Sequence, residues 1–142
     1  GLLTGAIEFS DKVAREVMVE LSDLVTVEHD VSAEGLEEVA ARTGYSRFPA
    51  VRDGEVVGYL HIKDALFVRP GEREEPMAAW RVRDLAKVEA DVEVESVLAL
   101  MRSTGSHVAL VHSGGTPVGV VFLEDIIEEL VGEVRDSIAR EA

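Results

Sequence analysis

The sequence predicts a mixed α/β (α+β) fold made of two copies of one unit, and three observations lead to that prediction. Positions 31–66 superpose on positions 92–127 without a gap, as expected of a duplicated structural unit. Each copy carries an amphipathic helical pattern followed by two short apolar runs around a turn. With 142 residues, 46% hydrophobic and 30% charged, the chain can form one ordinary core or two small halves that share it. We therefore expect two repeats packed sheet to sheet about a pseudo-twofold axis, with a cleft between them.

Each copy should contain one helix whose apolar residues recur at i, i+3, i+4 and i+7. In the first copy this apolar face consists of Leu36, Val39, Ala40 and Thr43. In the second copy it consists of Val94, Val97, Leu98 and Met101. Ser32 is a suitable N-cap, and Gly44 and Gly105 are suitable residues for the helix ends.

A hairpin should follow each of these helices. Residues 48–51 and 56–60 form apolar runs joined by Asp53-Gly54, and residues 108–111 and 118–122 are joined by Gly114-Gly115. A helix with an apolar and an acidic face should then close the second copy from Leu123 onward.

The segments that begin the two copies are less alike than the rest of the repeat. Residues 13–18 resemble residues 81–86, but in a different register from the rest of the repeat. This match predicts an opening helix in each copy and seven extra residues in the first. Proline, glycine and charged residues interrupt all periodicity in residues 69–80, which we interpret as a linker.

Composition and charge exclude several classes of protein. The 14 Lys and Arg residues oppose 28 Asp and Glu residues, and a net charge of -14 argues against nucleic-acid binding and against membrane binding through a basic patch. The absence of cysteine excludes disulfide scaffolds and thiolate metal sites. The longest apolar runs fall far short of the ~20 residues of a membrane-spanning helix. A start at Gly1 rather than Met is what we expect of a piece of a longer protein.

Three motifs in the chain point to a known family. They are Gly-Tyr-Ser-Arg-Phe-Pro at residues 44–49, Val-Gly-Tyr-Leu-His-Ile-Lys-Asp at residues 57–64, and Gly-Val-Val-Phe-Leu-Glu-Asp-Ile-Ile-Glu-Glu-Leu-Val-Gly-Glu at residues 119–133. With these motifs the sequence resembles a tandem pair of CBS domains, a Bateman module. It is most similar to the cytoplasmic module of the CorC/CNNM-type magnesium and cobalt transporters, also described as hemolysin-like. The resemblance implies a first CBS domain at residues 9–68, a linker at residues 69–80 and a second CBS domain at residues 81–136.

The resemblance implies a regulatory role rather than an enzymatic one. It implies an adenine-nucleotide site in the cleft, for ATP with or without Mg²⁺, and a homodimer formed through the helical faces. It further implies an attached membrane domain in the parent protein, whose cytoplasmic part this chain would be. Nucleotide binding would alter the angle between the two halves and so act on the membrane domain.

The site residues implied by the family motifs are Tyr45, Ser46, Arg47, Phe48, Pro49, His61, Asp64, His107, Phe122 and Asp125. Asp64 and Asp125 would accept hydrogen bonds from ribose hydroxyls, for which a carboxylate is suited. Arg47 would bind phosphate, and Tyr45 and Phe48 would flank the base. The structural alternatives are acids that favour a helix start, a surface arginine paired with an acid, and aromatic residues of the core.

Two positions depart from the family pattern. His61 and Phe122 stand where the family usually carries a Thr or Ser hydroxyl, three residues before the helix aspartate. Phenylalanine neither donates nor accepts hydrogen bonds, so two alternatives stay open. One is AMP or ADP binding at the other site, near His61 and Asp64, and the second is a dimerisation and tethering module with a degenerate nucleotide site.

Two other constellations of residues carry weaker signals. Glu124, Asp125, Glu128 and Glu129 could attract Mg²⁺, but a solvated acidic face of a helix explains them as well. The four histidines show no metal-ligand spacing, and no strained nucleophile turn is present, so we predict no protein-ligated metal and no enzymatic activity.

Overall fold

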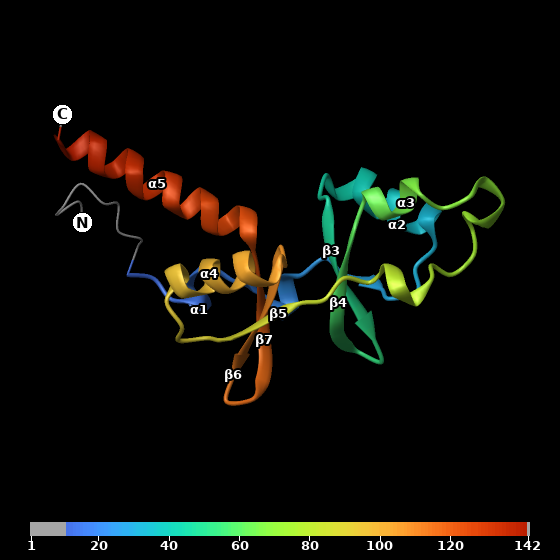
Figure 1. Cartoon of the computed structure of the whole chain (residues 1–142), viewed down its shortest axis with the longest axis horizontal. Helices are drawn as coiled ribbons and strands as arrows, with labels where there is room; N and C mark the ends of the chain where they lie inside the picture. The colour runs from blue at the N-terminus through green and yellow to red at the C-terminus, as the bar shows by residue number, and fades with distance from the viewer. Residues whose placement is uncertain (1–10, 142) are drawn as a thin grey trace. The chain divides into compact units, whose positions relative to one another are not determined.

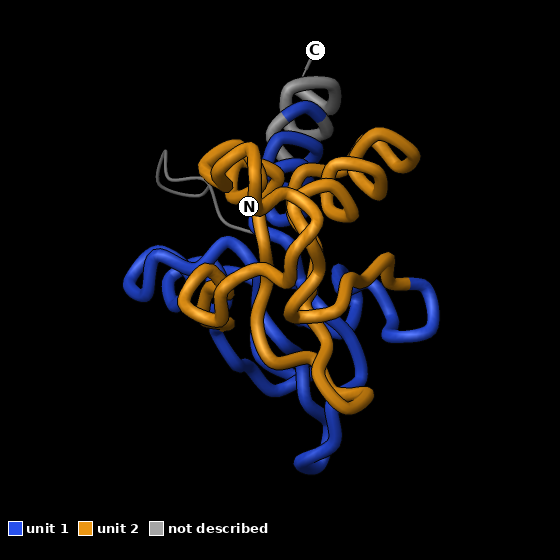
Figure 2. The backbone as a smooth tube through the Cα atoms, turned by 90° about the vertical axis from the view of Figure 1, so that its right-hand side faces the viewer, with its two compact units in different colours: residues 1–23, 86–142 blue, residues 24–85 orange. Residues whose placement is uncertain are grey.

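The computed structural model describes residues 11–141, with side chains described as far as Gly132 and at Arg135. Residues 9 and 10 of the predicted first domain lie outside the described residues. The chain divides into two compact units, coloured separately in Figure 2. Unit 1 contains residues 11–23 and 86–141, and unit 2 contains residues 24–85. Each unit is a mixed α/β structure with its own sheet, as the sequence predicts.

Unit 2 contains a three-stranded sheet and two helices (Figure 1). Its elements are β2 (Val27–Glu28), α2 (Ala33–Thr43), β3 (Arg47–Arg52), β4 (Glu55–His61), α3 (Lys63–Leu66) and the 3-10 helices η2 (Pro70–Glu72) and η3 (Ala79–Arg81). The strand order is β2-β3-β4, with β2 parallel and β4 antiparallel to β3. Unit 2 therefore has the helix, hairpin and short final helix that the first copy predicts.

Unit 1 contains a four-stranded sheet of order β1-β7-β6-β5. Its elements are α1 (Ala14–Val17), β1 (Val19–Glu20), η1 (Leu21–Asp23), β5 (Ala86–Glu89), α4 (Val94–Thr104), β6 (Val108–Ser113), β7 (Thr116–Phe122) and α5 (Leu123–Glu141). As in unit 2, a parallel strand, β5, lies on one side of an antiparallel hairpin, β6–β7. The predicted final helix is present as α5.

The two hairpins also correspond in the irregularity of their strand pairing and in the conformation of their turns. Both hairpins have an irregularity in strand pairing, between Ala50 and Val51 in one and between Val111 and His112 in the other. Both turns have positive φ at two successive residues, 51° and 80° at Asp53-Gly54 and 58° and 82° at Gly114-Gly115. Two positive φ values are typical of the tight turns that match the twist of hairpin strands. The duplication is therefore a structural repeat as well as a sequence repeat.

The helix ends are also as predicted. The side chain of Ser32 accepts a hydrogen bond from the backbone of Gly35 at 3.0 Å and so caps α2. Gly44 and Gly105 end α2 and α4 in the left-handed conformation, with φ of 77° and 70°.

The openings of the two copies differ from the prediction. Residues 13–18 contain the short helix α1, but residues 81–86 contain no helix, because η3 ends at Arg81 and β5 starts at Ala86. The predicted opening helix is therefore wrong for the second copy. An extended segment fits this place because residues 82–83 lie along β4.

The register of the openings also differs from the prediction. Val19 lies against Gly119 as Arg83 lies against Gly58, so Val19 and Arg83 are structurally equivalent. The internal match of residues 13–18 with residues 81–86 instead pairs Arg83 with Arg15, which lies four positions before Val19. The first copy is thus longer by three residues rather than seven, which matches the extra 3-10 turn η1.

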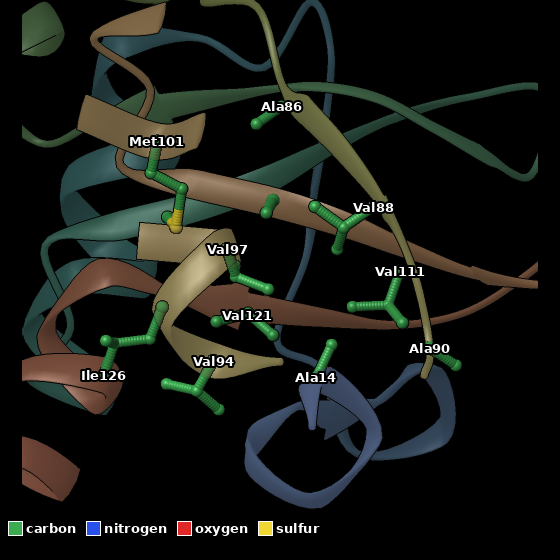
Figure 3. Packing of buried hydrophobic residues seen from close by; sticks show 11 residues of the cluster. Ala14, Ala86, Val88, Ala90, Val94, Val97, Met101, Val111, Val121 and Ile126 are labelled. Atoms are coloured by element: carbon green, nitrogen blue, oxygen red, sulfur yellow. The ribbon is translucent and has the colours of Figure 1, made fainter. Parts of the chain in front are cut away.

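Each unit has a buried apolar cluster of its own. In unit 1, α1, α4 and α5 pack on the sheet through Ala14, Ala86, Val88, Ala90, Val94, Val97, Met101, Ala109, Val111, Val121 and Ile126. Figure 3 shows these side chains gathered around Val97 and Val121. In unit 2 the cluster is Val27, Ala33, Leu36, Phe48, Leu60, Ala65 and Met77. Met77 belongs to the segment interpreted as a linker, so that segment contributes to the core of unit 2.

Candidate functional site

In unit 2 the candidate site residues gather where β4 ends and α3 begins. The carboxylate of Asp64 accepts a hydrogen bond from the backbone N–H of His61 at 2.8 Å. Arg83 donates to both oxygens of the same carboxylate, from Nη2 to Oδ1 at 2.7 Å and from Nε to Oδ2 at 3.3 Å. Asp64 is only 7% exposed, so its hydrogen bonds with Arg83 are shielded from water.

Three positive side chains lie close to the imidazole of His61. Arg47 lies opposite His61 in the β3–β4 pairing, and Lys63 follows His61 at the start of α3. The pKa of the His61 imidazole is lowered, first by partial burial and then by the charges of Arg47, Arg83 and Lys63. The hydrogen bonds to Asp64 raise the pKa of Arg83. His61 is therefore neutral at pH 7, and the net charge of this group of residues is positive within a chain of net charge -14.

A glycine places Arg83 beside Asp64. An added Cβ at Gly58 would lie 2.4 Å from the side chain of Val82 and 2.6 Å from the carbonyl oxygen of Arg83. The lack of a side chain lets residues 82–83 run directly along β4, where Arg83 and Tyr59 exchange backbone hydrogen bonds at 3.0 and 2.9 Å. The ion pair with Asp64 follows from this close approach.

The remaining candidates of unit 2 divide into exposed and buried side chains. Tyr45 is 57% exposed and Ser46 is exposed, whereas Phe48 is fully buried in the core. The rings of Tyr45 and Phe48 contact each other with centroids 6.5 Å apart. Pro49 is also buried. Of the two aromatic residues proposed to flank a base, Tyr45 is thus the one whose ring is open to solvent in unit 2.

The remaining three candidates lie in unit 1. Phe122 pairs with Val108 at the end of the β6–β7 hairpin, and the backbone N–H of Leu123 donates to the carbonyl of His107 at 3.0 Å. The bond from Ile62 to the carbonyl of Ser46, at 2.8 Å, is its equivalent in unit 2. The two units thus share the same backbone frame at this place, with different side chains on it.

The environment of Asp125 is the reverse of that of Asp64. Among the residues described, no donor reaches the Asp125 carboxylate, and the position equivalent to Arg83 is Val19. The pKa of Asp125 is raised, first by partial burial and then by the negative charges of Glu124 and Glu128. Among the described side chains, no group of three or more His, Asp or Glu residues has the arrangement of a metal site.

The sequence interpretation did not identify Arg83 as part of the site. The alignment of residues 81–86 with residues 13–18 placed Arg83 on a helix and paired it with the wrong position of the first copy. The paired glycines Gly58 and Gly119 were the available signal, because a small residue at the same place in two strands marks a close approach of another backbone segment.

Comparison with protein-family models identifies the class of protein to which the chain belongs. The model of the CBS domain matches residues 14–71 and again residues 81–132. The chain therefore belongs to the CBS-domain family and contains a pair of these domains. No helix within residues 11–141 has the length and the apolar composition needed to cross a membrane.

The relatives narrow this class to the CBS domains of one transporter group. The chain is 30% identical, with a TM-score of 0.77, to the CBS domain of a bacterial CNNM/CorC family Mg²⁺ transporter solved in complex with ATP. That match covers 85% of this chain and 88% of the other. A hemolysin-like CBS-domain protein of Oenococcus oeni is 26% identical, with a TM-score of 0.76, over 84% of this chain and 90% of its own.

Curated relatives are longer than this chain. An uncharacterized protein of Mycobacterium tuberculosis is 38% identical over 97% of this chain, which spans 42% of that protein. The UPF0053 protein YhdP of Bacillus subtilis is 31% identical over 91% of this chain, which spans 30% of that protein. The chain is a CBS pair related to the CBS domains of CNNM/CorC transporters, and it spans less than half the length of these curated relatives.

Proposed function

We propose that this chain is the regulatory adenine-nucleotide-binding module of a divalent-cation transport protein of the CNNM/CorC kind. The relationship to a CBS domain solved with ATP supports the ligand class. The observation that carries the proposal is the positive group of Arg47, Lys63 and Arg83 around His61, in an otherwise strongly acidic chain. The parent protein would hold this module on the cytoplasmic side of its membrane domain, as a homodimer.

Each residue of this positive group would have a specific task. Arg47 and Lys63 would bind phosphate oxygens, and an arginine can do so with two parallel hydrogen bonds. Asp64 would accept a ribose hydroxyl, because its carboxylate has about four acceptor positions and three donors already reach it. Mg²⁺ would arrive with the phosphates, as it usually does with nucleotides. Tyr45 would stack on the base.

The acidic surroundings of Asp125, in unit 1, make it less suited to holding the phosphates of a nucleotide. Asp125 has acceptor capacity for a ribose, but Glu124 and Glu128 would repel a triphosphate. We therefore assign the phosphates to Arg47 and Lys63, and the alternative ligands AMP or ADP would bind at the same place, near His61 and Asp64.

Binding should be measured by thermal shift and calorimetry with ATP, ADP and AMP, each with and without Mg²⁺. A ligand at 100 times its dissociation constant adds about 2.7 kcal/mol, which should raise the unfolding midpoint by about 5–10 °C. Arg47→Gln should abolish most of the shift with ATP. Arg52→Gln, at the other end of the same strand, is the matched control and should leave it intact.

A second function is favoured by two observations, the engagement of Asp64 by Arg83 and the phenylalanine at position 122. On this alternative the chain is a dimerisation and tethering module whose nucleotide site is degenerate. The variant Phe122→Thr separates the two functions. Binding in the unmodified chain supports the nucleotide sensor, whereas binding gained only in the variant, or absent from both, supports the tethering module.

A further inference from the structure

The carboxylate of Asp64 has most of its hydrogen-bonding capacity in use within the chain itself. A carboxylate accepts about four hydrogen bonds, about two at each oxygen. Oδ2 of Asp64 accepts from the backbone N–H of His61 at 2.8 Å and from Nε of Arg83 at 3.3 Å. Oδ1 accepts from Nη2 of Arg83 at 2.7 Å. The acceptor position that is left therefore lies on Oδ1.

Arg83 supplies two of the three hydrogen bonds that use this capacity. Both come from one guanidinium, whose nitrogens face the two oxygens of the carboxylate. The third comes from the backbone at His61, just before α3, and is therefore set by the fold. Of the described donors to Asp64, only the side chain of Arg83 can be removed by a substitution.

The backbone at Arg83 is held independently of this ion pair. Arg83 and Tyr59 exchange backbone hydrogen bonds along β4 at 3.0 and 2.9 Å. The side chain of Arg83 is 46% exposed, whereas that of Asp64 is 10% exposed. Loss of the guanidinium would therefore uncover the carboxylate without removing a side chain from the buried cluster of unit 2.

The number of free acceptor positions decides how a carboxylate binds a ribose. A ribose presents two neighbouring hydroxyl donors, at C2′ and C3′, and a carboxylate with two free positions can accept from both. With Arg83 in place, Asp64 can accept from only one of them. The other hydroxyl then contributes nothing to binding through Asp64, so a sugar that lacks it should bind as tightly as ribose.

We infer that Arg83 determines the sugar specificity of this site. By occupying Asp64 it limits recognition of the sugar to one hydroxyl, so that ATP and at least one of its two monodeoxy analogues bind equally tightly. The inference rests on the proposed function, because it takes the nucleotide to bind at Asp64. Arg83 acts on the sugar through Asp64, as a positioning residue, and needs no contact with the nucleotide.

The second aspartate has no partner of this kind. Among the described residues no side chain donates to the carboxylate of Asp125, and Val19 stands at the position equivalent to Arg83. A ribose at Asp125 could therefore use both hydroxyls, and a site built on Asp125 would bind both deoxy analogues more weakly than ATP. Sugar specificity thus distinguishes a nucleotide at Asp64 from one at Asp125.

The test is titration calorimetry of the full chain with ATP, 2′-deoxy-ATP and 3′-deoxy-ATP, each with Mg²⁺. The three ligands carry the same base and triphosphate, so the ratios of their dissociation constants report on the sugar. For the unmodified chain, at least one analogue should bind within about two-fold of ATP, because the missing hydroxyl made no hydrogen bond. Arg83→Met should bind both analogues at least about ten-fold more weakly than ATP, since each then lacks one hydrogen bond to a charged group.

Three further variants control for charge, folding and position. Arg69→Met removes an exposed arginine of the same unit and should keep the ratios of the unmodified chain. Arg83→Gln offers one donor nitrogen in place of two and should discriminate in the same direction as Arg83→Met, but less strongly. Asp64→Asn combined with Arg83→Met should lose most of the gained discrimination, because an amide accepts through one oxygen only. Thermal unfolding shows which variants are folded.

Two results would overturn the inference while leaving nucleotide binding in place. The first is weak binding of both analogues by the unmodified chain, which would place the sugar at a carboxylate with two free positions, such as Asp125. The second is a folded Arg83→Met that binds both analogues as tightly as ATP, with Arg83→Gln deciding if Arg83→Met does not fold. If neither the unmodified chain nor a folded variant binds any of the three nucleotides, the proposed function fails and this inference fails with it.

Discussion

Asp64 and Asp125 occupy the same place in the two copies, at the start of the helix that follows the hairpin, yet their surroundings are opposite. Asp64 is shielded and receives three hydrogen bonds, two of them from Arg83. Asp125 is partly exposed and has Glu124 and Glu128 as its charged neighbours. The backbone frame is the same in both, so the difference comes from a few side chains, chiefly Arg83 against Val19. A duplicated fold can thus keep its geometry while its two candidate sites acquire opposite charge.

The largest expected effect on stability concerns a feature that the two units share, a strand glycine against which another backbone segment lies. Gly58→Ala should lower the free energy of unfolding by about 1–3 kcal/mol, because the new methyl group would overlap the side chain of Val82 and the carbonyl of Arg83. Gly119→Ala should cost only somewhat less: its methyl group would also lie 2.6 Å from a backbone carbonyl, that of Val19, but the side chain it meets is the flexible one of Met18. Urea unfolding of both variants measures the difference.

Gly71→Ala is the control for these glycines. A Cβ at Gly71 meets no atom within 4 Å, and its φ is not positive, so this variant should keep the stability of the unmodified chain. A harmless Gly58→Ala would show that residues 82–83 do not lie against β4 and would remove the reason for the ion pair with Asp64.

The next largest effect on stability is expected at Asp64, and it distinguishes Asp64 from Asp125. Asp64→Asn should cost about 1–3 kcal/mol of unfolding free energy, because a shielded charge-assisted hydrogen-bond pair is lost. A double-mutant cycle with Arg83→Gln should show positive coupling between the two residues, reduced by the partial exposure of Arg83. Additive losses would mean that the ion pair contributes nothing to stability.

The smallest effect is expected at Asp125, where the substitution should stabilise the folded chain rather than destabilise it. Its pKa is raised in the folded chain, so the folded state binds protons more tightly than the unfolded state does. The penalty that Asp125 imposes on the folded state is therefore fully present above the folded pKa and disappears as the pH falls through the folded and then the unfolded pKa. Asp125→Asn should add a few tenths of a kcal/mol at pH 7, the size of like-charge repulsion along a helix.

The check for Asp125 is a series of urea unfolding curves between pH 4 and pH 7. The difference in stability between Asp125→Asn and the unmodified chain should grow as the pH rises. A variant that is less stable at pH 7 would show that the favourable position of Asp125 in the first turn of α5 outweighs the repulsion.

The sequence alone was sufficient to predict the features that depend on neighbouring residues. The helix cap at Ser32, the left-handed glycines Gly44 and Gly105, and the turns at Asp53-Gly54 and Gly114-Gly115 are all set by local conformational preference. The internal repeat predicted two equivalent hairpins, and their pairing irregularities occur at equivalent positions. Family motifs in the sequence also identified the CBS pair.

Only the tertiary structure decided which distant residues meet. Arg83 is 19 residues from Asp64 in the chain, and the pairing depends on where residues 82–83 lie along β4 rather than on any local preference. The exposed part of α5 was equally hidden, since periodicity marks Ile126 and Ile127 as apolar alike, and packing alone buries one and leaves the other half exposed. Local preferences act within a few residues and can be read from a sequence, whereas charge pairing and burial depend on the packing of segments far apart in the chain.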